Sequence, residues 1–126
     1  MIDDETTTLF RPAGQKELAL IAETEWKRFP PRLFWQPIFY PVLTEEYAER
    51  IARDWNTKDP NSGFVGYVLR FKVRDSFLGQ FEVHEVGGRD CREYWIPAED
   101  LDAFNDNIVG AIELVREFRP PGTLQK

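Results

Sequence analysis

Residues 39–55 read FYPVLTEEYAERIARDW, an apolar run that passes directly into an amphipathic pattern. The apolar run begins at Pro37 and ends at Val42, a length typical of a strand that is covered on both faces. Thr44 is a favourable helix N-cap, and the acidic residues that follow it suit the positive end of a helix dipole. The stretch therefore predicts a central strand that leads into a helix ending near Trp55.

The elements before this stretch follow from the same kinds of pattern. Residues 7–11 predict a short strand ended by Pro12, which cannot donate to a sheet ladder. Apolar residues then recur at helical spacing, which predicts a helix over 15–27. Residues 29–37 combine three prolines with aromatic side chains, so we expect an ordered loop there.

The elements after the stretch are mostly strands. The patterns predict a turn at 59–63, a half-exposed strand over 65–73, a partner strand at 81–84, a turn at Gly87-Gly88, a strand at 92–97, a short helix at 100–105 and a last strand at 108–118. This order predicts an α+β fold with antiparallel or mixed sheets, two main helices and one short helix. We expect a single domain over 7–119, with flexible termini at 1–6 and 120–126.

Length and composition limit the classes of function. The chain has 126 residues, a net charge of −6 and 42% hydrophobic residues, as expected for one globular domain. A single cysteine, no apolar leader and no run long enough to span a bilayer predict a cytoplasmic protein without membrane contact. The basic residues are dispersed, which argues against general nucleic-acid binding. His84 is the only histidine, so no metal site is predicted.

Two glutamates are candidates for a functional carboxylate. Glu93 shares a strand face with Trp95, so it either faces solvent or lies in an aromatic-lined cleft. Glu113 lies on a mostly apolar face of the last predicted strand, where a carboxylate needs a partner. A structural ion pair is the interpretation we favour for Glu113.

Other candidates are a cation and several aromatic residues. Arg11 ends the first predicted strand and is either directed at a ligand or an ordinary surface residue. Tyr40 offers a ring for stacking and a hydroxyl for hydrogen bonding, or is part of the core. Phe34 and Trp35 either cover a ligand or pack the proline-rich loop onto the domain.

The segments Thr8-Leu9-Phe10-Arg11, Ile38-Phe39-Tyr40 and Glu93-Tyr94-Trp95-Ile96-Pro97, in this order, resemble the split-sheet fold of ADP-ribosyltransferases. The whole chain is also similar to a family of small bacterial proteins that carries the name ADP-ribosylation/crystallin J1. The resemblance implies that Arg11 orients NAD, that Tyr40 helps to seat the nicotinamide ribose, and that Glu93 stabilises the cation formed as nicotinamide leaves.

The chain departs from the transferase pattern at two places. The middle strand lacks the Ser-Thr-Ser motif of many toxins, and Cys91 stands where protein-modifying members carry Glu or Gln. The resemblance implies a protein that binds NAD as a substrate, without a metal, and transfers ADP-ribose to an acceptor that the sequence does not identify. The alternative is a non-catalytic protein-interaction module that uses Phe34 and Trp35 as a partner patch.

Overall fold

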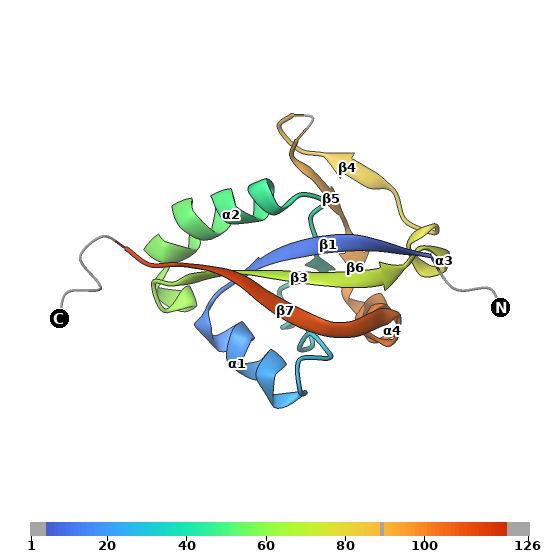
Figure 1. Cartoon of the computed structure of the whole chain (residues 1–126), viewed down its shortest axis with the longest axis horizontal. Helices are drawn as coiled ribbons and strands as arrows, with labels where there is room; N and C mark the ends of the chain where they lie inside the picture. Colours follow the sequence, from blue (N-terminus) through green and yellow to red (C-terminus); the bar gives the residue numbers. More distant parts are fainter. Residues whose placement is uncertain (1–4, 89, 121–126) are drawn as a thin grey trace.

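Three long antiparallel strands form the centre of the fold in a computed structural model of the chain, which describes residues 5–88 and 90–120 (Figure 1). The strands are β1 Thr6–Ala13, β2 Ile38–Phe39, β3 Gly66–Arg74, β4 Val83–Glu85, β5 Arg92–Tyr94, β6 Ile96–Pro97 and β7 Ile108–Phe118. The α-helices are α1 Gln15–Glu23, α2 Glu45–Asp54, α3 Asp75–Leu78 and α4 Leu101–Asp106. The central sheet has the order β1-β3-β7, so the predicted α+β class is confirmed.

The segment 37–43 connects the central sheet to the second half of the fold. Val42 bridges Phe10 of β1 on one side and Glu93 of β5 on the other. Farther along, β2 pairs antiparallel with β6, and β4 pairs antiparallel with β5. The segments that carry residues 11, 40 and 93 are therefore direct neighbours in space.

The predicted continuous strand over 37–42 is wrong in its extent. Only Ile38 and Phe39 form a regular strand, and Val42 makes an isolated bridge. Pro41 lies between them and has no N–H to donate to a ladder, although its carbonyl accepts from the backbone nitrogen of Tyr94 at 2.9 Å.

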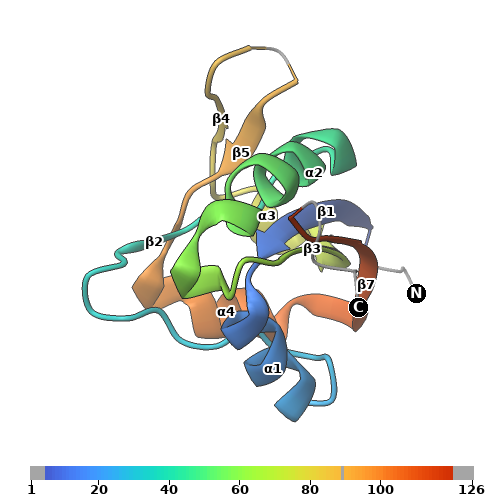
Figure 2. The ribbon, with the colours of Figure 1, turned by 90° about the vertical axis from the view of Figure 1, so that its left-hand side faces the viewer.

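Helix α2 covers one face of the central sheet (Figure 2). Its small residues Ala48 and Ala52 pack with Val68 of β3, and all three are fully buried. A Cβ atom at Gly66 would lie 2.3 Å from the carbonyl oxygen of Ala52, so only glycine permits this close approach. The first half of β3, Gly66 to Leu69, is buried on both faces, which corrects the prediction of a half-exposed strand along its whole length.

The main core lies on the opposite face of the sheet, against α1 and α4 (Figure 2). Four phenylalanine rings form its centre. Their centroids lie 4.8 to 6.5 Å apart in edge-on or tilted pairs: Phe29, Phe39, Phe71 and Phe104. This core also holds the start of the loop that leads to the site described below.

Helix α1 ends at Glu23, four residues earlier than predicted. The hydroxyl of Thr24 donates to a carbonyl in the last turn at 2.7 Å. Glu25 and Trp26 then have φ values of 63° and 64°, a left-handed conformation that is uncommon for residues with a side chain. The carbonyl of Trp26 accepts from the backbone nitrogen of Ile112 in β7 at 2.7 Å, and this contact between distant segments has no local sequence signal.

Strand β1 continues through Pro12 to Ala13, so the prediction that Pro12 ends the strand is wrong. Phe10 exchanges two backbone hydrogen bonds of 2.8 Å with Val42, on the side away from β3. Because alternate residues of a strand direct their backbone groups to the same side, the nitrogen of Pro12 also points away from β3. Proline is tolerated there because no ladder bond is required of it.

Several other predictions are confirmed or refined. Thr44 caps α2 by accepting from the backbone nitrogen of Tyr47 at 3.2 Å, and the last strand has the predicted bounds. Gly87 and Gly88 form the predicted turn with φ values of 95° and 139°. The short helix α3 was not predicted, and the partner strand begins at Val83 instead of residue 81.

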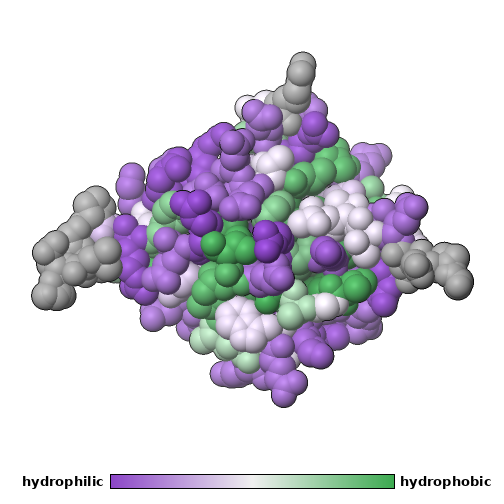
Figure 3. All heavy atoms as spheres, viewed as in Figure 1, coloured by the Kyte–Doolittle hydropathy of each residue, from purple (hydrophilic) through white to green (hydrophobic). Residues whose placement is uncertain are grey.

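The predicted flexible termini, 1–6 and 120–126, lie largely outside the described residues, although Thr6 belongs to β1. None of the described helices is long and apolar enough to cross a membrane. Figure 3 shows polar side chains over α2 and apolar side chains along the middle of the same view. Val109 and Leu114 of β7 remain partly exposed.

Candidate functional site

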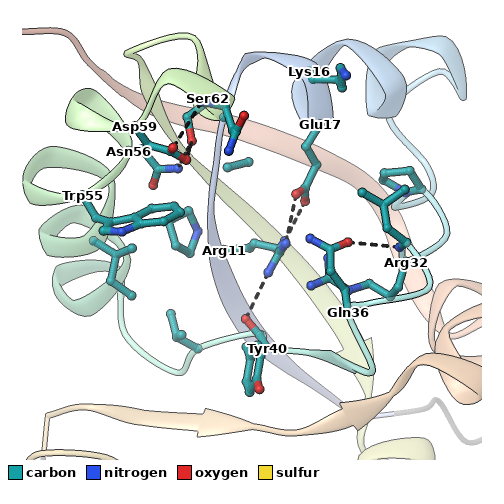
Figure 4. Close-up of a pocket in the computed structure, with 18 of the residues that line it drawn as sticks. Arg11, Lys16, Glu17, Arg32, Gln36, Tyr40, Trp55, Asn56, Asp59 and Ser62 are labelled. Carbon is teal, nitrogen blue, oxygen red and sulfur yellow. Dashed lines mark hydrogen bonds and ion pairs between the residues drawn. The ribbon is translucent and has the colours of Figure 1, made fainter.

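A groove of about 1130 Å³ opens beside the ends of β1, β5 and α2 (Figure 4). Arg11, Tyr40 and Glu93, the three residues predicted to form the site, all line it. Its lining also contains the cations Lys16 and Arg32 and several aromatic and amide side chains. This volume is slightly above the range of about 300–1,000 Å³ that is usual for small-molecule sites.

Glu93 lies at the wall of the groove and is only 8% exposed, so the interpretation as a solvated strand residue is wrong. Its Oε1 accepts from the hydroxyl of Tyr47 at 3.0 Å, and its Oε2 accepts from the indole nitrogen of Trp95 at 2.8 Å. Both donors are neutral. Among the described residues, no basic side chain forms an ion pair with Glu93. The carboxylate is thus held in one orientation without a neutralising cation.

Tyr47 of α2 also lines the groove, although it was not selected as a site residue from the sequence. Burial raises the pKa of Tyr47 to about 12, and the hydrogen bond to Glu93 acts in the same direction. The phenol therefore stays protonated and continues to donate to the carboxylate at neutral pH. A hydroxyl on the apolar face of a helix was the sequence signal for this role.

Arg11 lines the groove as predicted, but an acid in α1 binds its guanidinium. Nε and Nη2 donate to the two carboxylate oxygens of Glu17 at 2.6 and 2.9 Å. Nη1 donates to the carbonyl of Tyr40 at 3.4 Å, and the guanidinium lies 4.5 Å from the ring centroid of Phe39. The ion pair with Glu17 neutralises most of the charge that an anionic ligand would require.

Arg32, in the loop between α1 and β2, is a second cation that the sequence analysis did not select. Figure 4 places it on the same side of Arg11 as Gln36. It donates no hydrogen bond to any described residue, and its Nε is buried without a partner. Burial lowers the pKa of Arg32, and the positive charge of Arg11 lowers it further.

Aromatic rings form the wall next to Glu93. Tyr40 is 40% exposed, which excludes the interpretation as a core residue, and its ring meets that of Trp95 edge-on at 6.4 Å. His84 stacks on Trp95 with 3.7 Å between centroids and 8° between planes. The indole that donates to Glu93 therefore contacts two neighbouring rings.

A polar cluster lies at the other end of the groove, beside the exposed ring of Trp55 (Figure 4). Asn56 donates to the hydroxyl of Ser62 at 2.9 Å, and Ser62 donates to Asp59 at 2.9 Å. Asn56 is only 4% exposed, and its Oδ1 has no hydrogen-bond partner among the described residues. This end of the groove therefore places a largely buried polar cluster beside an exposed aromatic surface.

The proline-rich loop carries an exposed aromatic tip. Phe34 is 94% exposed, and its ring meets that of Trp35 edge-on at 4.8 Å. Trp35 also lines the groove. The interpretation that this loop simply packs its aromatic residues onto the domain is therefore wrong for Phe34.

The remaining candidates lie outside the groove. Glu113 of β7 forms an ion pair with Arg70 at 2.8 Å, which confirms the structural interpretation. Cys91 is buried, and its sulfur accepts a hydrogen bond from Nη1 of Arg50 at 3.2 Å. No group of three or more potential metal ligands occurs in the described part of the chain, so the expectation of a metal-free site stays a prediction.

No family model, curated protein or solved structure matches the chain. The chemistry of the groove is therefore what points to a function.

Proposed function

We propose that the groove binds NAD or a closely related nucleotide and that the protein is an ADP-ribosyltransferase-like enzyme. The observation that carries the proposal is the setting of Glu93, a buried carboxylate with two neutral donors and no described counter-cation. Such a group keeps its negative charge available for a positive charge that develops on a bound ligand. Its fixed orientation means that little reorganisation is needed when that charge appears.

ADP-ribose transfer creates such a charge. The bond between C1′ of the ribose and the nicotinamide nitrogen breaks, and its electron pair leaves with nicotinamide. Positive charge then grows on the ribose until an acceptor forms a new bond to C1′ and loses a proton. A carboxylate beside the ribose stabilises this transition state more than the bound substrate, and this difference accelerates the reaction. With water as acceptor, the products are ADP-ribose, nicotinamide and a proton.

Two further features support this assignment. Arg11, Tyr40 and Glu93 lie on neighbouring backbone segments in the order that the resemblance to ADP-ribosyltransferases implies, with Val42 bridging both β1 and β5. Tyr40 and Trp95 supply exposed rings next to the carboxylate, where a nicotinamide ring can stack. These features favour nicotinamide near Glu93 and the rest of the nucleotide along the groove.

NAD binding and nicotinamide release test the proposal. At 100 times its dissociation constant, NAD is expected to stabilise the fold by about 2.7 kcal/mol in a thermal-shift measurement. Glu93→Gln is expected to abolish nicotinamide release, followed by chromatography, while NAD binding stays near the wild-type value. Glu113→Gln is the matched control, because it removes an exposed carboxylate that lies outside the groove. No shift at millimolar NAD, or equal release by wild type and Glu93→Gln, would contradict the proposal.

The second candidate is the protein-interaction module, which the exposure of Phe34 favours. A failure of NAD to bind, together with a partner that Phe34→Ser no longer recruits, would support this function. Retention of the partner by Phe34→Ser would exclude the loop tip as its contact.

A further inference from the structure

We propose that Arg32 is the residue of the groove that binds a phosphate group of the ligand. This inference deepens the proposed function, because it names the cation that would receive the phosphates of the bound nucleotide. It is carried by the absence of any hydrogen bond or ion pair from Arg32 to a described residue, although the side chain is partly buried in the groove. Guanidinium groups removed from water are normally paired, so an unpaired one indicates a place for an anion.

The comparison with Arg11 identifies which cation is available. Both guanidinium groups lie over the ring of Phe39, at 4.5 Å for Arg11 and 5.8 Å for Arg32. Glu17 binds Arg11 through two hydrogen bonds, whereas Arg32 has no acid in contact. Glu17 therefore pairs with Arg11, and the guanidinium of Arg32 remains available to a ligand.

The accessible atoms of Arg32 suit a phosphate. Its Nε is enclosed by protein, but the two terminal nitrogens are not among the buried unpaired atoms, so an anion in the groove can reach them. These two nitrogens form a planar fork that can donate to two phosphate oxygens at once. Lys16 of α1 also lines the groove and adds to its positive charge.

The loop that carries Arg32 is fixed at both ends, so the loop does not need to become ordered when a ligand binds. The backbone nitrogen and carbonyl of Phe29 are both bonded to the side chain of Asn105, at 2.9 and 3.0 Å. At the other end, the carbonyl of Pro37 accepts from the backbone nitrogen of Ala98 at 2.8 Å. Preorganisation of this kind lowers the entropic cost of binding.

Calorimetric titration with ADP, inorganic pyrophosphate and adenosine tests the proposal. Arg32→Gln removes the charge and is expected to weaken the binding of ADP and of pyrophosphate by about 10- to 100-fold, the loss of one or two charge-assisted hydrogen bonds. Adenosine has no phosphate, so its binding should not change. Arg70→Gln, which removes an exposed arginine paired on the sheet, is the control and should bind like wild type. Arg32→Lys keeps the charge and should recover part of the affinity.

The outcomes separate this inference from the proposed function. Arg32-dependent binding of ADP and pyrophosphate without binding of NAD would support the phosphate site and contradict the proposed function. NAD binding that Arg32→Gln leaves unchanged would support the nucleotide groove and overturn the assignment of Arg32. Equal weakening of ADP and adenosine, or no binding of ADP and pyrophosphate to the wild-type protein, would also overturn it. Circular dichroism of each variant shows whether a loss of binding reflects a loss of fold.

Discussion

Glu93→Gln is expected to remove activity without removing stability. In the wild-type protein, Oε2 accepts from the indole nitrogen of Trp95, which can only donate, and Oε1 accepts from the hydroxyl of Tyr47. Glutamine has the same shape and can direct its oxygen at Trp95. Its amide nitrogen then faces the hydroxyl of Tyr47, which can reverse its role and accept. Both contacts can therefore survive the substitution.

The free energy of unfolding follows from two opposing changes. Two charge-assisted hydrogen bonds become neutral, which costs about 1 to 1.5 kcal/mol each. The substitution also removes the cost of burying a charge, which stabilises the variant. This desolvation penalty is several kcal/mol for a buried ion before its hydrogen-bond partners offset it. Because the groove leaves part of this region near solvent, we expect the two changes to cancel to within about 1 kcal/mol.

Tyr47→Phe provides the internal comparison, because it leaves the carboxylate and removes one donor. An oxygen of Glu93 that loses its partner costs about 1 to 3 kcal/mol, so this variant should be less stable than Glu93→Gln. Urea denaturation followed by tryptophan fluorescence measures both. A loss of more than about 2 kcal/mol in Glu93→Gln, or the reverse order of the two variants, would show that the carboxylate is a structural anchor of the fold.

Three further predictions concern the core, the α2 contact and pH. Phe104→Ala should destabilise the fold by about 3–5 kcal/mol, since its ring meets four other phenylalanine rings, while the exposed Phe34→Ala should stay within about 0.5 kcal/mol in the same denaturation assay. Gly66→Ala should cost about 2–3 kcal/mol because its Cβ would lie 2.3 Å from the Ala52 carbonyl oxygen, and an unchanged denaturation midpoint would contradict this packing. The pKa of Tyr47 is about 12 in the fold against 10 for a free tyrosine, so the unfolded chain loses this proton first and the contribution to stability falls as pH rises from 10 towards 12. Titration of tyrosinate absorbance in wild type and in Tyr47→Phe checks this, because the difference between the two curves reports Tyr47 alone. A difference curve with its midpoint near pH 10 would show that the phenol of Tyr47 is not buried and hydrogen-bonded.

Caps, helical spacing and strand alternation predicted the elements that neighbouring residues in the sequence determine. The cap at Thr44 and the helical spacing after it placed α2, and the alternation along residues 108–118 placed β7 at its observed bounds. Predictions failed where a distant segment decides the conformation. Helix α1 ends early at the turn where β7 contacts the chain. Strand β1 passes through Pro12 because the nitrogen of Pro12 lies on the side away from β3, where no ladder bond is required of it.

The same division holds for the groove. The residue types and the order of Arg11, Tyr40 and Glu93 were visible in the sequence, because strand periodicity and a family resemblance are properties of the chain. Which acid binds Arg11 and which arginine is left unpaired were not visible, since the strength of a charge depends on burial and on neighbours within a few ångströms. Those neighbours, Glu17 beside Arg11 and Tyr47 beside Glu93, come together only when α1 and α2 have packed beside the strands.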